Sequence, residues 1–80
     1  MNEFSDRFAA LRKASGAKQT DFEEQFGLSE RTVRNYETGK QFPRLDIAAA
    51  LADHFNVSLD YLVGRTDDPH GGYSPKDGAP

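Results

Sequence analysis

Apolar side chains recur every three or four residues through most of the chain, the spacing that gathers them on one face of a helix. Phe4, Phe8 and Leu11 show this spacing first, and Phe22 and Phe26 repeat it. No segment alternates apolar and polar residues as a half-buried strand would. The pattern predicts short helices over residues 3–14, 19–26, 30–37, 47–55 and 59–63. We therefore expect an all-α domain, built as a compact five-helix bundle.

Polar residues and glycines mark the ends of these helices. Ser29 is placed to cap the third helix, because its hydroxyl can accept hydrogen bonds from the free amides of the first turn. Gly27 and Gly39 stand just past the second and third helices. Asp46 and Ser58 are candidate caps for the fourth and fifth. Because the turn between the second and third helices is so short, the two must cross steeply, as in a helix-turn-helix.

The composition of the chain changes after residue 64. Residues 65–80 hold almost no aliphatic side chains, while prolines and glycines crowd among them at Pro69, Gly71, Gly72, Pro75, Gly78 and Pro80. Such a segment cannot bury enough apolar surface to order itself. We expect one folded domain over residues 1–64 and a flexible, disordered tail over residues 65–80.

Several classes of function are disfavoured by what the sequence lacks. There is no cysteine, which excludes disulfides and cysteine-ligated zinc. No apolar run approaches the roughly 20 residues that span a membrane, and the mixed, charged N-terminus does not resemble a secretory signal. His54 and His70 have no partner at metal-ligand spacing, and no catalytic motif occurs. We expect a cytoplasmic protein that is not an enzyme and needs no metal or cofactor.

The net charge of −3 argues at first against a nucleic-acid partner, so the distribution of charge matters. Residues 27–44 hold four cations against two carboxylates, a net of +2. Residues 67–80 hold one cation against three carboxylates, a net of −2. A short basic segment inside a mildly acidic chain predicts local binding to DNA, with weak affinity for non-specific sequences.

The third predicted helix gathers its polar side chains on one side. At about 100° per residue, Val33 and Tyr36 share one face, while Arg31 and Asn35 point the opposite way and Arg34 lies on the flank. Arginine can pair with guanine O6 and N7, and asparagine with adenine N6 and N7, in a groove wide enough for a helix. Taken alone, the same residues are also typical of a solvated helix surface, and this alternative remains open at this point.

In its order of motifs the chain resembles the phage repressor and Cro type of helix-turn-helix regulators, from about residue 4 to residue 64. The matching motifs are Leu11-Arg12, Gly16, Gln19, Phe22, Phe26-Gly27-Leu28-Ser29, Val33, Tyr36-Glu37-Thr38-Gly39-Lys40, Pro43 and Val57-Ser58-Leu59-Asp60-Tyr61-Leu62. The resemblance implies a lambda-repressor-like fold and a sequence-specific transcriptional regulator, a repressor that binds an operator of two half-sites as a homodimer. The alternative is an antitoxin or anti-repressor module that acts mainly through a protein partner.

The resemblance also implies roles in contacting DNA for matching positions. The positions where the family reads bases or flanking phosphates are Glu30, Arg31, Arg34 and Asn35. The positions that match phosphate contacts are Gln19, Thr38, Lys40 and Arg44. In the family, the residue at Gln19 can in addition brace a neighbouring reading residue.

Other matching positions have structural roles in the family. Arg12 and Glu37 match a pair that forms an internal salt bridge in some members. Phe42 and Tyr61 lie near the family's dimer contacts and are the candidates for that role. Glu23 departs from the pattern, since the family usually has a small residue where the second helix approaches the third. A glutamate there requires room or a partner.

Overall fold

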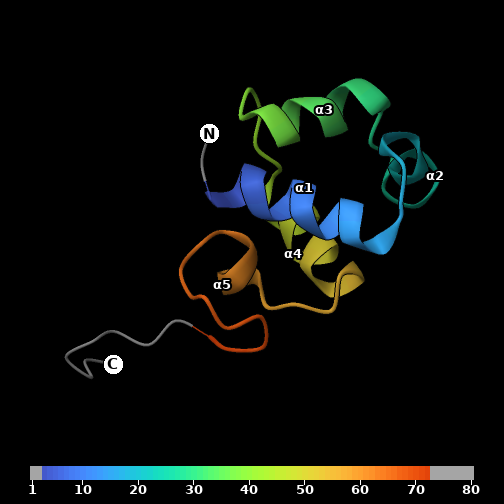
Figure 1. The fold of residues 1–80 in the computed structure, drawn as a ribbon. Coiled ribbons are helices and arrows are strands. Elements are labelled where there is room, and N and C mark those ends of the chain that lie inside the picture. Colours follow the sequence, from blue (N-terminus) through green and yellow to red (C-terminus); the bar gives the residue numbers. More distant parts are fainter. Residues whose placement is uncertain (1–2, 73–80) are drawn as a thin grey trace.

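The computed structural model describes residues 3–72, which form helices joined by short turns and no strand (Figure 1). The elements are α1 (Glu3–Ser15), a 3₁₀-helix η1 (Gln19–Asp21), α2 (Phe22–Phe26), α3 (Glu30–Thr38), α4 (Leu45–His54) and α5 (Leu59–Leu62). α3 lies along one side of α1, while α5 lies on the other side with α4 packed against it (Figure 1). The predicted all-α domain with five α-helices is confirmed within this range.

The core forms where the apolar faces of the other helices meet α1. Phe8 is fully buried, and its ring centroid lies 5.7 Å from that of Phe22, 5.9 Å from that of Tyr36 and 6.0 Å from that of Phe55. Leu62 of α5 is also fully buried. Helices as short as α2 and α5 are not stable alone in water. Burial of these side chains is therefore what holds the short helices in place.

The turn between α2 and α3 follows the predicted pattern. Gly27 has φ +70°, and apart from Gly27 itself and its two chain neighbours no atom lies within 4 Å of the point where a Cβ would stand. The left-handed backbone, rather than a lack of space, therefore requires glycine there. The Ser29 hydroxyl caps α3 by accepting from the Thr32 amide at 3.1 Å. Gly39, with φ +80°, ends the helix. The start and length of α3 are thus fixed locally.

Two helix starts differ from the prediction. The second predicted helix opens as η1, because the Asp21 amide donates to the Lys18 carbonyl three residues back at 3.1 Å. The Asp21 carboxylate closes this turn by accepting from the Lys18 amide at 2.8 Å. α4 begins already at Leu45, so Asp46 is not its cap but lies in its first turn. There the carboxylate suits the positive end of the helix dipole and pairs with Arg44 at 3.2 Å.

The structure also differs from the predicted boundary at residue 64, because the residues that follow lie against the domain. Arg7 of α1 donates to the Thr66 carbonyl at 2.5 Å and to the Asp67 carboxylate at 2.6 Å. The same guanidinium donates to the Tyr61 carbonyl and lies 4.2 Å from the centre of the Tyr61 ring. One side chain therefore joins α1, α5 and the segment after α5.

Ser58 makes the second attachment of this segment. Its amide donates to the Pro69 carbonyl at 2.7 Å, and its hydroxyl donates to the Gly71 carbonyl at 2.7 Å. The same hydroxyl caps α5 by accepting from the Tyr61 amide at 3.0 Å. We call residues 65–72 the C-terminal strap. The domain therefore extends to residue 72, and the rest of the expected tail, residues 73–80, lies outside the described residues.

Candidate nucleic-acid interface

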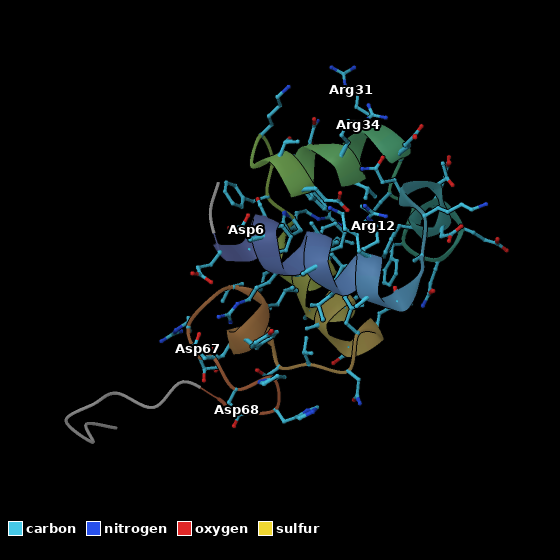
Figure 2. All side chains as sticks on the ribbon, in the orientation of Figure 1. Asp6, Arg12, Arg31, Arg34, Asp67 and Asp68 are labelled. Carbon is cyan, nitrogen blue, oxygen red and sulfur yellow. The ribbon has the colours of Figure 1, made fainter. Side chains whose placement is uncertain are left out.

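α3 has one buried face and one outward face. Val33 and Tyr36 are 0% and 3% exposed and anchor the helix in the core. Burial raises the pKa of the Tyr36 phenol, and the positive charge of Arg44 partly offsets this effect. The phenol is therefore neutral near pH 7. Arg31 and Arg34 project from the opposite face, away from α1 (Figure 2).

The outward face near the start of α3 carries three charged side chains. Glu30 and Arg34, one turn apart, form an ion pair of 3.4 Å in which each side chain is 52% exposed. A pair of this kind contributes only about 0.3–0.5 kcal/mol, so it opens readily when a stronger partner arrives. Arg31 is exposed and has no ion-pair partner among residues 3–72. Its guanidinium is free to meet a ligand.

On the inward side of α3, Glu37 is held by side chains from other elements. The Arg12 guanidinium donates to both Glu37 carboxylate oxygens, from Nη2 at 3.1 Å, and donates to the Ala17 carbonyl at 3.0 Å. The two charged side chains are only 13% and 10% exposed, and Figure 2 shows Arg12 reaching from α1 toward α3. Hydrogen bonding to Glu37 raises the pKa of Arg12, against the opposing effect of burial. The one inward carboxylate of α3 is thus neutralised inside the domain.

Gln19, at the start of η1, belongs to the same network. Its side-chain amide donates to Glu37 at 3.2 Å. The expectation that Gln19 braces a reading residue stays a prediction, since the hydrogen bond that the structure shows for its side chain goes to Glu37. The role of Gln19 as a phosphate contact also stays a prediction.

Further candidate phosphate contacts stand at and after the end of α3. Thr38, Lys40 and Arg44 are all exposed. The Thr38 hydroxyl donates back to the Arg34 carbonyl at 3.0 Å. Arg44 pairs with Asp46 at 3.2 Å, with both side chains mostly in solvent. These groups continue the polar surface from α3 into the loop that leads to α4.

The acidic residues of the C-terminal strap lie far from this surface. Figure 2 places Asp67 and Asp68 at the opposite end of the domain from Arg31 and Arg34. Asp67 is in addition bound to Arg7 at 2.6 Å. Asp67 and Asp68 therefore contribute to the net charge of −3 without lying beside α3.

A second surface feature is apolar. Phe42, Leu45 and Val63 are 58%, 74% and 39% exposed and line one groove of about 530 Å³; we call them the apolar patch. Sequence reasoning named Phe42 but missed the other two, because no sequence pattern marks them as exposed. Tyr61, the other dimer candidate, does not line this groove; its ring faces Arg7 instead.

Several other expectations concern single residues and the chain as a whole. Glu23 is exposed, so its charge needs no partner between α2 and α3. His54 is also exposed, with its ring against Phe26 and Phe55. Residues 3–72 contain no group of three His, Cys, Asp or Glu side chains arranged to hold a metal ion. None of the helices in this range has the length and apolarity needed to cross a bilayer.

The chain was compared with protein families, with curated proteins and with solved structures. A family model described as helix-turn-helix matches residues 8–62. The chain is 35% identical over 66 residues to the uncharacterized HTH-type transcriptional regulator YobD of Bacillus subtilis. It is 30% identical over 63 residues to the cryptic phage CTXphi transcriptional repressor RstR of Vibrio cholerae. It is 26% identical over 61 residues to the HTH-type transcriptional activator BcrR of Enterococcus faecalis.

These matches cover 82%, 79% and 76% of this chain but only 59%, 56% and 30% of the three relatives. The chain therefore spans little more than half the length of the first two. No solved structure matches the chain significantly.

Proposed function

This chain belongs to the helix-turn-helix family of the phage repressor and Cro type, and on that premise we propose that it is a sequence-specific DNA-binding regulator of transcription, a repressor. The observation that carries the proposal is the two-sided α3. Its inner face is anchored by Val33 and Tyr36, while Arg31 projects outward. A relative named as a repressor supports the direction of regulation, and another named as an activator makes it a point to test. Such a regulator acts in the cytoplasm, where its DNA is.

In this proposal α3 enters the major groove with its outward face against the base edges. Arg31 and Asn35, one turn apart, contact neighbouring positions, the first suited to guanine and the second to adenine. Glu30 and Arg34 flank them, and opening of their exposed 3.4 Å pair frees both for bases or phosphates. A glutamate can accept a hydrogen bond from the cytosine amino group.

Contacts to the phosphate backbone position α3 in the groove. Lys40 and Arg44 supply positive charge from the loop after α3, and the Thr38 hydroxyl supplies a polar contact. The Gln19 amide nitrogen carries two hydrogens, so it can serve a phosphate while it still donates to Glu37. These contacts carry affinity and salt dependence but no sequence information.

The proposed regulator binds as a homodimer to an operator with two half-sites. A single reading helix makes few base contacts, and pairing two copies across a two-fold axis doubles them. The apolar patch supports this part of the proposal, because exposed apolar side chains gathered in one groove are typical of an interaction surface. A Leu45→Glu variant is then expected to be monomeric in sedimentation, at concentrations where the wild type is a dimer.

Selection of binding sites from random duplex DNA tests the reading role. Arg31→Ala and Asn35→Ala should each lose the preference at one base pair of each half-site, a loss of roughly 5- to 150-fold in discrimination. Lys13→Ala, which removes an exposed charge at the end of α1, is the matched control and should keep the wild-type preferences. If both α3 variants select the same sequences as the wild type, α3 is a solvated surface and not the reading element.

Binding measurements on the same wild-type protein distinguish the regulator from the alternative function. A steep fall in DNA affinity with rising salt supports the regulator. Tight binding of a protein partner by a chain that does not bind DNA would instead support an antitoxin or anti-repressor module.

A further inference from the structure

The loop that follows α3 folds back onto a single residue, Asn35. The Asn35 backbone carbonyl accepts from the amide of Gly39, from that of Lys40 at 3.0 Å and from that of Gln41 at 3.3 Å. The left-handed conformation of Gly39, with φ +80°, turns the chain so that these successive amides can reach one acceptor. The position of Gln41 relative to Asn35 is therefore set by the backbone.

The two side chains also meet. The Asn35 amide nitrogen donates to the Gln41 carbonyl oxygen at 3.3 Å. An asparagine amide carries a donor and an acceptor at nearly the same place, so it can present either group in a given direction. Gln41 is itself an amide, but in the structure its carbonyl oxygen is the atom that faces Asn35, and an oxygen accepts a hydrogen bond only from the Asn35 nitrogen. In this pairing the Asn35 nitrogen is turned toward Gln41, although neither the position nor the spacing of Gln41 marked it as part of the site.

We propose that Gln41 is a positioning residue for base reading, which fixes the Asn35 amide in the orientation that adenine requires. Adenine presents an acceptor at N7 and a donor at N6, so asparagine must offer its nitrogen and its oxygen in a set order. One hydrogen of the Asn35 amide nitrogen binds Gln41, and the second remains for the base. This inference rests on the proposed function, since it assumes that Asn35 reads a base.

A free side chain must be ordered when it binds, whereas a held side chain is ordered beforehand. The difference corresponds to about 2- to 10-fold in affinity for one side chain. Only the contact with adenine depends on the fixed orientation of Asn35. Removing the Gln41 side chain should therefore reduce the preference for that base pair. Contacts made by Arg31 and by the loop cations should keep their strength.

The test is a double-mutant cycle on the full chain, read by fluorescence anisotropy with duplexes taken from the wild-type site selection. The measured quantity is the ratio of Kd values for duplexes with and without the base pair that Asn35 reads. Gln41→Ala should lower this ratio about 2- to 10-fold and leave the ratio at the Arg31 base pair unchanged. In the Asn35→Ala background, Gln41→Ala should have no further effect. Gln25→Ala, which removes an exposed glutamine of α2, is the control.

A conservative variant separates positioning from simple structural support. Gln41→Glu keeps an oxygen acceptor for Asn35 and adds a negative charge near the phosphates. It should therefore weaken binding to both duplexes while their ratio stays at the wild-type value. Gln41 is exposed, so each variant should fold, and circular dichroism checks this.

Two results would overturn the inference while the proposed function stands. The first is a Gln41→Ala variant whose ratio of Kd values equals that of the wild type. The second is a Gln41→Ala change that lowers the ratio equally in the wild-type and in the Asn35→Ala background, which would mean that Gln41 contacts DNA itself. A wild-type chain that selects no sequence at all would overturn both the inference and the proposed function.

Discussion

Replacing Arg12 with methionine should destabilise the domain strongly, although Arg12 lies at the edge of the core. The change keeps part of the side-chain volume but removes the guanidinium that binds both oxygens of Glu37. Glu37 then keeps only the hydrogen bond from Gln19 at 3.2 Å. The result is a carboxylate that is 10% exposed and has lost its counter-charge.

The expected magnitude depends on whether this pair behaves as a surface pair or as a buried pair. Exposed pairs contribute about 0–1 kcal/mol, whereas removing one partner of a buried pair costs about 3–5 kcal/mol. Exposures of 13% and 10% put Arg12 and Glu37 near the buried case. Since Gln19 remains, we expect the lower end, about 3 kcal/mol. A chain of 80 residues has a total stability of about 4–12 kcal/mol, so this is a large share of it.

Urea unfolding followed by circular dichroism measures the effect in a cycle of four proteins: wild type, Arg12→Met, Glu37→Leu and the double variant. The double variant removes both charges and leaves no unpaired carboxylate, so it should lie within about 1 kcal/mol of the wild type. A loss below about 1 kcal/mol in Arg12→Met would show that solvent screens the pair. Additive losses in the double variant would show that the two residues are not coupled, and either result would refute the reasoning.

Truncation after Arg65 should lower the Tm by about 4–8 °C, because Arg7 and Ser58 lose partners in the C-terminal strap; an unchanged Tm would show that the strap contributes nothing to stability. Lys40→Ala and Arg44→Ala should each flatten the salt dependence of DNA binding by about one unit and weaken binding to all sequences alike, and a changed base preference would contradict their phosphate role. Burial raises the pKa of Tyr36 above the 10.0 of a free phenol, so the folded state holds this proton more tightly than the unfolded chain. Its contribution to stability is then fully present below pH 10 and is lost as the pH rises through the folded pKa. Tyr36→Phe should flatten the fall of stability above about pH 10, and equal slopes in both proteins would argue against the burial effect.

The helices of this domain could be predicted because their signals act within one turn of the chain. Ser29 caps α3 through an amide three residues away, and Gly39 ends it through its own φ angle. The C-terminal strap could not be predicted in this way. Arg7 donates to the Thr66 backbone carbonyl, 59 positions away, and to the Asp67 carboxylate, 60 positions away, and no local pattern relates residues so far apart. The hydropathy pattern predicts which apolar side chains are buried, but it does not predict hydrogen bonds between distant polar groups.

The same distinction applies to the candidate site. The helical period separates Arg31 from Val33 as soon as α3 is recognised, so the outward face could be predicted. Gln41 lies in a loop, where no period relates one residue to another, and its place beside Asn35 follows from the turn at Gly39. Leu45 is the first residue of α4 and is 74% exposed, and the sequence pattern marked neither its place in the helix nor its exposure.

An acidic chain can still present a surface suited to DNA, because the distance of each carboxylate from α3 matters more than the sum of charges. At physiological salt, interactions between exposed charges fade beyond about 8 Å. Asp67 and Asp68, at the far end of the domain, are therefore screened from a duplex on α3 (Figure 2). Glu37 belongs to α3 itself, where distance gives no such protection. Glu30, the other carboxylate of α3, pairs with Arg34 at the surface, whereas Glu37 is only 10% exposed and is paired with Arg12 of α1. If α3 reads DNA as we propose, the ion pair between Arg12 and Glu37 also neutralises a repulsive charge on the inward side of that helix.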